Sequence, residues 1–282
     1  MSRQRSGWRV VAGGVFGALA ATLVSSANSA EAVDVELVLA VDVSLSMSPD
    51  ELGIQRDGYA AALKDQRVID AITSGLHGRI ALTYFEWAGS VTQRVIIPWT
   101  IIETAEDANR VADTLTATPP SSARRTSISS ALEFGADLFA ESPFRGMKRV
   151  IDVSGDGPNN QGAPVAYVRD EVAAQGIVIN GLPLMTNGGM STPYDVEDLD
   201  EYYADCVITG PGAFVIPVNE WSQFPEAIRR KLVLELAAPL SPVRMAEEAA
   251  GAPLTRVQSR SAYDCLVGEK LWRDRQWMFD SR

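Results

Sequence analysis

Apolar and polar positions alternate along the chain in blocks that predict strands and helices in turn. The residues from Val35 to Val43 are apolar almost without interruption, which predicts a strand buried on both faces, as in the middle of a parallel sheet. Apolar residues at helical spacing predict helices at 49–73, 104–116, from Thr126 to about 139, near 165–172, weakly at 195–208, and at 223–236. Further apolar runs predict strands at 79–87, 91–99, 148–153, 176–184 and 213–218.

This order of elements predicts the fold class. Only a short Gly-Ser turn separates the strands at 79–87 and 91–99, so these two strands must be antiparallel. The other strands alternate with helices, which is typical of parallel pairing. We therefore expect an α/β fold, a doubly wound and mostly parallel sheet with one antiparallel edge strand and helices on both faces.

The two ends of the chain differ from this central pattern. Residues 1–32 have a basic start, a short apolar run and an Ala-Glu-Ala site, which predicts a cleaved Sec-type signal peptide; an uncleaved anchor is the alternative. Residues 33–238 form the expected domain. Residues 239–282 are a proline-punctuated C-terminal extension, which we expect to dock on the domain, with Trp272 and Trp277 as anchors. The expected location is periplasmic or secreted, with no transmembrane span after cleavage.

Charge and cysteine content follow from this division. Removing residues 1–32 leaves 22 basic and 35 acidic residues of the 25 and 36 in the chain. A domain this acidic repels phosphate backbones, so nucleic acid is excluded as a partner class. Cys206 and Cys265 would meet an oxidising compartment, and we expect them to form a disulfide; two buried free thiols are the alternative.

Oxygen-bearing side chains follow the first buried strand. Asp42, Ser44 and Ser46 come at every second position where that strand ends, and Ser48 and Glu51 then form a capping box at the next helix start. The three side chains therefore lie between the carboxyl end of a buried strand and a helix. Ligands of open α/β sheets bind in that crevice.

Two more oxygen ligands are expected at the same edge of the sheet. Thr126 opens a helix after a loop, and Asp156 follows the strand at 148–153. Together with Asp42, Ser44 and Ser46 they make a set of two carboxylates and three hydroxyls, with no histidine or thiol, which suits a hard cation. Small hydroxyl ligands favour Mg²⁺, with Mn²⁺ as its substitute.

The rim of this site has two candidate segments. Arg124 and Arg125 stand directly before Thr126 and would help to hold an acidic ligand, although a solvated loop is the simpler interpretation. The loop at 186–193 follows a strand at the same edge of the sheet, and it either borders the site or is an ordinary connection.

The motif Asp42-x-Ser44-x-Ser46, followed by Thr126 at a helix start and by Asp156-Gly157, resembles the metal-ion-dependent adhesion site of the von Willebrand factor type A (vWA) domain. The resemblance covers about residues 35–237 and is greatest with exported bacterial members of unassigned function. It implies that these five residues bind Mg²⁺ and that the metal accepts an Asp or Glu carboxylate from a protein partner. Two positions depart from the family pattern: Arg124-Arg125 replaces glycines before the threonine, and Gly155 replaces a threonine before the aspartate.

We therefore expect a non-enzymatic, metal-dependent protein-binding module of the adhesion or assembly type. One alternative is a Mg²⁺-dependent hydrolase of phosphate esters. The sequence offers it no nucleophile elbow or phosphate loop, and its single histidine, His77, lies at a predicted helix end. The other alternative is a structural envelope protein with a vestigial site. Partner, pathway and oligomeric state do not follow from the sequence.

Overall fold

A computed structural model describes residues 30–186, 196–237 and 263–280, and the side chains of the last segment as far as residue 275. Residues 1–29 of the predicted signal peptide, most of the loop at 186–193, and residues 239–262 of the extension lie outside the described residues, whereas Glu31 and Ala32, which end the predicted signal peptide, already belong to the first strand of the sheet. Among the helices described, none is both long enough and apolar enough to cross a membrane.

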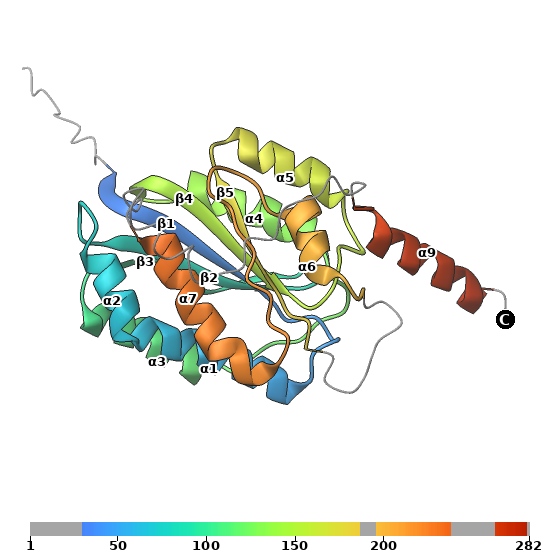
Figure 1. The fold of residues 1–282 in the computed structure, drawn as a ribbon, viewed down its shortest axis with the longest axis horizontal. Helices are drawn as coiled ribbons and strands as arrows, with labels where there is room; N and C mark the ends of the chain where they lie inside the picture. Colours follow the sequence, from blue (N-terminus) through green and yellow to red (C-terminus); the bar gives the residue numbers. More distant parts are fainter. Residues whose placement is uncertain (1–29, 187–195, 238–262, 281–282) are drawn as a thin grey trace, which may run out of the picture.

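The described part of the chain forms one five-stranded sheet covered by helices on both faces (Figure 1). The strand order is β3-β2-β1-β4-β5, with β1 paired in parallel to β2 and β4, β4 paired in parallel to β5, and β3 antiparallel to β2. This confirms the predicted doubly wound sheet with one antiparallel edge strand. The strands are β1 (Glu31–Asp42), β2 (Ile80–Trp87), β3 (Gln93–Ile102), β4 (Phe144–Gly155) and β5 (Val178–Pro183).

Two apolar cores follow from the alternation of side chains along β1. The odd-numbered residues Leu37, Leu39 and Val41 share a core with helices α1 (Pro49–Lys64), α2 (Gln66–Thr73), α3 (Ala105–Ala117) and α7 (Phe224–Leu236), the last of which follows the short helix η2 (Trp221–Gln223). The even-numbered Val38 and Ala40 face α4 (Ile128–Ala140), α5 (Val165–Ala174), α6 (Leu199–Tyr202) and the π-helical turn η1 (Tyr203–Val207). A strand buried on both faces explains the unbroken apolar run in the sequence.

Three predicted elements are wrong in detail. The helix expected at 49–73 is two helices, because Asp65 accepts a hydrogen bond from the Arg67 backbone and starts a new helix. The helix expected to start at Thr126 starts at Ile128, with Ser127 as its N-cap. Residues 213–218 form no regular strand and only make isolated bridges to the β5 edge. Pro217 in this stretch lacks the N–H that a ladder needs.

The last described element is α9 (Val267–Asp280), which begins beside the η1 and α5 end of the domain and projects outward from it (Figure 1). Tyr263, Cys265 and Val267 at its start pack against the core that contains η1. The C-terminal segment is thus in contact with the domain at the edge where the candidate site lies.

Candidate metal site

The predicted site residues lie where two neighbouring strands end. Asp42 is the last residue of β1, and Asp156 directly follows Gly155, the last residue of β4. From these strands the chain continues in opposite directions across the sheet, to β2 on one side and to β5 on the other. A crevice at such a reversal of strand order is the usual ligand site of an open α/β sheet.

Two serine hydroxyls and one carboxylate meet in this crevice. Ser44 Oγ and Ser46 Oγ are 2.9 Å apart, and Ser46 Oγ donates to Asp156 Oδ1 at 2.8 Å. Ser44 Oγ lies 3.4 Å from the same oxygen. Neighbouring ligands of an octahedral Mg²⁺ with bonds of about 2.1 Å lie about 3 Å apart, so the spacing of these three oxygens fits that ion.

Asp42 is fully buried behind these hydroxyls. Its Oδ1 accepts a hydrogen bond from the Ser44 backbone at 2.7 Å, whereas Oδ2 has no hydrogen-bond partner among the described residues. Burial raises the pKa of Asp42 well above its usual value, and the charge of Asp156 raises it further, against the opposing effect of the hydrogen bond from Ser44. A bound divalent cation would reverse this effect, because it favours the charged carboxylate. The buried, unpartnered oxygen and the hard donor set therefore fit Mg²⁺ or Mn²⁺.

Helix α1 fixes the segment that carries the serines. Gln55 of α1 donates from Nε2 to the backbone oxygen of Asp42 at 2.9 Å. Ser48 and Glu51 form the predicted capping box at the start of α1, and Trp221 Nε1 donates to Glu51 Oε1 at 2.8 Å. The chain from Asp42 to Ser48 is therefore held at both ends.

The loop before Thr126 lies directly beside the serine segment. The Leu45 backbone donates to Ala123 O at 2.9 Å, and the hydroxyl of Ser121 donates to Glu86 Oε2 at 2.6 Å. Glu86, buried in β2, is also paired with the buried Arg56 of α1. Glu86 thus joins α1 and the loop through one buried carboxylate, which holds the loop beside the serine segment.

Thr126 reaches the site through its backbone contacts. Its N–H donates to Asn160 Oδ1 at 3.1 Å, and its carbonyl accepts from the Asn160 backbone at 2.8 Å. Asn160 stands four residues after Asp156, so Thr126 lies against the segment that follows this carboxylate. Hydrogen bonds join Ser44, Ser46 and Asp156, and Asp42 is bonded to Ser44; the role of the Thr126 hydroxyl stays a prediction.

The two rim arginines differ. Arg124 is exposed, whereas the guanidinium of Arg125 lies 3.2 Å from the centre of the Trp272 ring of α9. Arg125 has φ of +79°, a strained value for a residue with a side chain. Arg125 therefore connects the site loop to the C-terminal helix, and Arg124 is the arginine that faces solvent. The Trp277 side chain and residues 187–193 of the predicted rim loop lie outside the described part.

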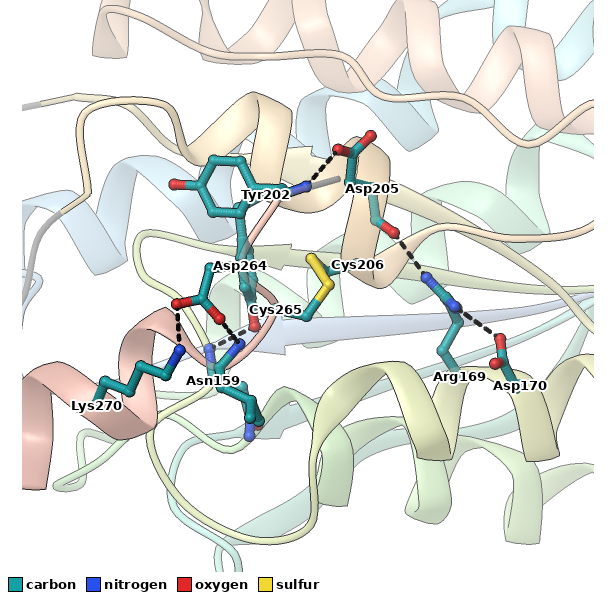
Figure 2. Close-up of a disulfide and its surroundings, with 11 residues drawn as sticks. Asn159, Arg169, Asp170, Tyr202, Asp205, Cys206, Asp264, Cys265 and Lys270 are labelled. Carbon is teal, nitrogen blue, oxygen red and sulfur yellow. Dashed lines mark hydrogen bonds and ion pairs between the residues drawn. A yellow bond between two sulfur atoms is a disulfide. The ribbon is translucent and has the colours of Figure 1, made fainter. Parts of the chain in front are cut away.

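The predicted disulfide is present and ties this C-terminal segment to η1 (Figure 2). Cys206 and Cys265 are bonded with an Sγ–Sγ distance of 2.00 Å. Beside the bond, Asn159 donates from Nδ2 to Glu269 Oε1 of α9 at 2.8 Å, and its backbone donates to the hydroxyl of Tyr202 at 3.1 Å. The loop after Asp156 is thus bonded to α9, which follows Cys265, and to α6, which precedes Cys206.

Several supporting residues are missing from the sequence prediction. Gln55 has a usable signal, because it is a polar residue on the apolar face of α1, one turn after Glu51. Asn160 has none, since it acts through a contact with Thr126, a residue 34 positions away in the chain.

Solved structures of low sequence identity share this fold. Proximal thread matrix protein 1 from the mussel byssus, with a zinc-occupied MIDAS motif, has a TM-score of 0.54 at 16% identity over 73% of this chain and 48% of that one. The pilus adhesin SpaC from Lactobacillus rhamnosus GG has a TM-score of 0.52 at 12% identity, over 72% of this chain and 31% of its own. The chain thus spans less than half the length of either protein.

The described part of the chain therefore has the α/β fold of these solved structures, one of which carries a MIDAS motif, in agreement with the resemblance noted in the sequence. A type A domain from Catenulispora acidiphila also matches, with a TM-score of 0.49 at 14% identity over 73% of this chain and 43% of that one. Residues 32–240 match the family described as "Protein of unknown function (DUF1194)", and the chain belongs to that family. No curated protein matches the sequence.

Proposed function

We propose that the chain is a metal-dependent protein-binding module that acts outside the cytoplasm and is not an enzyme. Mg²⁺, or Mn²⁺ in its place, is held by Asp42, Ser44, Ser46, Thr126 and Asp156, and takes an Asp or Glu carboxylate from a protein partner. The observation that carries the proposal is the spacing of Ser44 Oγ, Ser46 Oγ and Asp156 Oδ1 beside the buried, unpartnered Asp42 Oδ2.

The donor set explains why such a metal would seek an acidic partner. Two carboxylates only balance a divalent ion, and neutral hydroxyls complete the site without neutralising it further. The metal therefore stays electrophilic towards a further oxygen, and the exposed Arg124 adds positive charge to the neighbouring loop. A carboxylate is the protein side chain that can both bind the metal through an oxygen and pair with the positive charge of Arg124.

The named relatives support an adhesive role. One similar structure is a matrix protein of mussel threads whose metal site holds zinc, and another is a pilus adhesin. Against the hydrolase alternative, His77 lies in the loop between α2 and β2, where its backbone donates to Asp34 near the start of β1. That is the opposite end of β1 from Asp42, so the single histidine is out of reach as a general base.

Metal binding is the first test. Calorimetry should show Mg²⁺ and Mn²⁺ binding to the native protein and its loss in Asp156→Ala, because this change removes the carboxylate that both serines contact. Asp113→Ala is the matched control, since Asp113 is an exposed carboxylate on α3. Loss of folding in Asp156→Ala would instead make the residue structural, and no binding by native protein would favour the vestigial-site alternative.

Partner binding is the second test. Capture of proteins from an envelope extract should require Mg²⁺, fail with chelator and fail with Asp42→Ala bait. Converting the acidic residue of a captured partner to its amide should then abolish binding. Turnover of phosphate esters that is lost in Asp42→Ala would overturn the proposal in favour of a hydrolase.

Export is tested separately. Cell fractionation should place the protein outside the cytoplasm, and its first residue there should lie close to position 33. Protein retained in the cytoplasm with residues 1–32 attached would contradict this part of the proposal.

A further inference from the structure

The hydroxyl of Tyr203 lies close to the Asp42 carboxylate, and Gly155 stands between them. A Cβ atom built on Gly155 would be 2.9 Å from Asp42 Oδ2 and also 2.9 Å from the Tyr203 hydroxyl oxygen. The two oxygens therefore border the same small space. Gly155 leaves this space open because it has no side chain.

Both oxygens are buried and have no hydrogen-bond partner among the described residues. Tyr203 and Asp42 are each 0% exposed. Buried polar atoms in native proteins are nearly always bonded to protein or to an ordered water, so two unpartnered oxygens that border one space can satisfy each other after a small shift of the hydroxyl or through one bridging water. A phenol donates and a carboxylate accepts, so the pair is chemically complementary.

We propose that Tyr203 is a positioning residue of the metal site: its hydroxyl donates to Asp42 Oδ2, directly or through one bridging water, and orients this carboxylate towards the cation. The inference rests on the proposed metal-binding function. Tyr203 does not touch the ion and acts only through Asp42. Since carboxylate ligands need an outer partner to fix their rotamer, the tyrosine completes the support that Ser44 gives to Oδ1.

The position of Tyr203 is itself fixed from outside. It opens the π-helical turn η1, and Cys206, three residues later, carries the disulfide to Cys265 (Figure 2). Its ring packs edge to face on that of Tyr202, with 6.2 Å between ring centres, and Tyr202 is in turn bonded to the Asn159 backbone. Single π-helical turns are frequent at functional sites. Here the turn places the Tyr203 hydroxyl close to Asp42, which is a proposed metal ligand.

A tyrosine hydroxyl has an ordinary pKa of about 10, so it keeps its proton and is a donor at neutral pH. An acceptor is already present in Asp42 Oδ2.

The test compares Tyr203→Phe with native protein and with Tyr84→Phe. Tyr84 is a matched control, because it is an equally buried tyrosine of β2 in the core on the other face of the sheet. Mn²⁺ and Mg²⁺ affinities are measured by calorimetry, and the Mn²⁺ environment by electron paramagnetic resonance. The melting temperature is recorded with chelator and with metal.

We expect Tyr203→Phe to weaken Mn²⁺ binding about 10- to 100-fold and to change the Mn²⁺ spectrum, while Tyr84→Phe binds as the native protein does. The stabilisation by metal should shrink in Tyr203→Phe, whereas its melting temperature in chelator should stay at or above the native value.

Equal Mn²⁺ affinity in native protein and Tyr203→Phe would overturn this inference and leave the metal site in place. A fall in melting temperature in chelator, with unchanged affinity, would mean that Tyr203 only supports the core and would also overturn it. Native protein that binds neither metal would overturn the proposed function, and this inference with it.

Discussion

At the scale of single residues, Gly155 accounts for a departure from the family pattern. The vWA resemblance leads one to expect a threonine before Asp156, but any side chain here would meet Asp42 Oδ2 and the Tyr203 hydroxyl, each 2.9 Å from the Cβ position. The tyrosine therefore occupies the space that a side chain at position 155 would need. Because Gly155 has no side chain, the Tyr203 hydroxyl has room beside Asp42 in this chain.

Gly155→Ala should therefore weaken metal binding. The added methyl group pushes the Asp42 carboxylate or the Tyr203 ring out of place, and we expect at least a tenfold loss of Mn²⁺ affinity in calorimetry. Overpacking of this kind also costs about 1–3 kcal/mol of stability.

Gly157→Ala is the matched control, because a Cβ there meets nothing within 4 Å. If the two variants lose metal affinity equally, crowding around Asp42 is not the cause.

At the scale of elements, α7 is fixed to the sheet by a buried cluster of charged groups. Lys231 of α7 lies 3.1 Å from Asp152 Oδ1 of β4 and 2.6 Å from Glu235 Oε1, and all three side chains are 0% exposed. Asn180 of β5 donates to Glu235 Oε1 at 2.9 Å. The Lys231 ammonium group thus lies within ion-pair distance of two buried carboxyl groups, those of Asp152 and Glu235.

Lys231→Met should destabilise the fold strongly, because it leaves the buried acidic side chains of Asp152 and Glu235 without the Lys231 ammonium group. We expect a loss of about 3–5 kcal/mol in urea denaturation. Lys64→Met is the control, since Lys64 pairs with Asp113 at the surface at 2.6 Å and such pairs contribute at most about 1 kcal/mol. Similar losses in both variants would contradict this role for Lys231.

The same cluster predicts a dependence of stability on pH. Burial, and then the charge of Glu235, raises the pKa of Asp152 to about 8, against the opposing effect of Lys231. The native state therefore keeps a proton that the unfolded chain releases near pH 4, so this contribution to stability falls as pH rises from about 4 to about 8.

Asp152→Asn should remove that part of the slope, as measured by urea denaturation in chelator at pH 5 and pH 8. Asp113→Asn, at the surface, should leave the slope as it is in native protein. A slope unchanged in Asp152→Asn would show that Asp152 is ionised throughout this range.

At the scale of the whole molecule, the sequence predicts the parts that depend on local patterns. The unbroken apolar run of β1, the Ser48–Glu51 capping box and the polar ends of β1 and β4 each appear within a few consecutive residues. Because parallel strands end at one edge of a sheet, these local features were enough to bring Asp42 and Asp156 together.

The parts that were missed depend on contacts between distant segments. The break that Asp65 makes is an exception, because it is local: Leu63 and Ile69 are six residues apart and do not lie on one face of a single helix. The π-helical turn of Tyr203 spans only five residues and has no periodic pattern. Its place behind Asp42 is set by β4, β5 and the disulfide, which a local pattern does not describe.

The disulfide also predicts a change in global stability. Cys206 and Cys265 are 59 residues apart, so the bond restricts the unfolded chain and contributes about 4 kcal/mol in the chain-entropy treatment. Reductant, or the double change of Cys206→Ala and Cys265→Ala, should lower the melting temperature by more than 5 °C. A melting temperature that does not respond to reductant would contradict this contribution.

The same bond closes the chain into a covalent ring between positions 206 and 265. A protease that cuts the backbone once anywhere inside this ring produces a nicked molecule whose two fragments remain joined. Such a molecule would migrate as one band on a non-reducing gel and as two bands after reduction. The helix that bears Trp272 would in this way stay attached to the domain even after the peptide connection between them is lost.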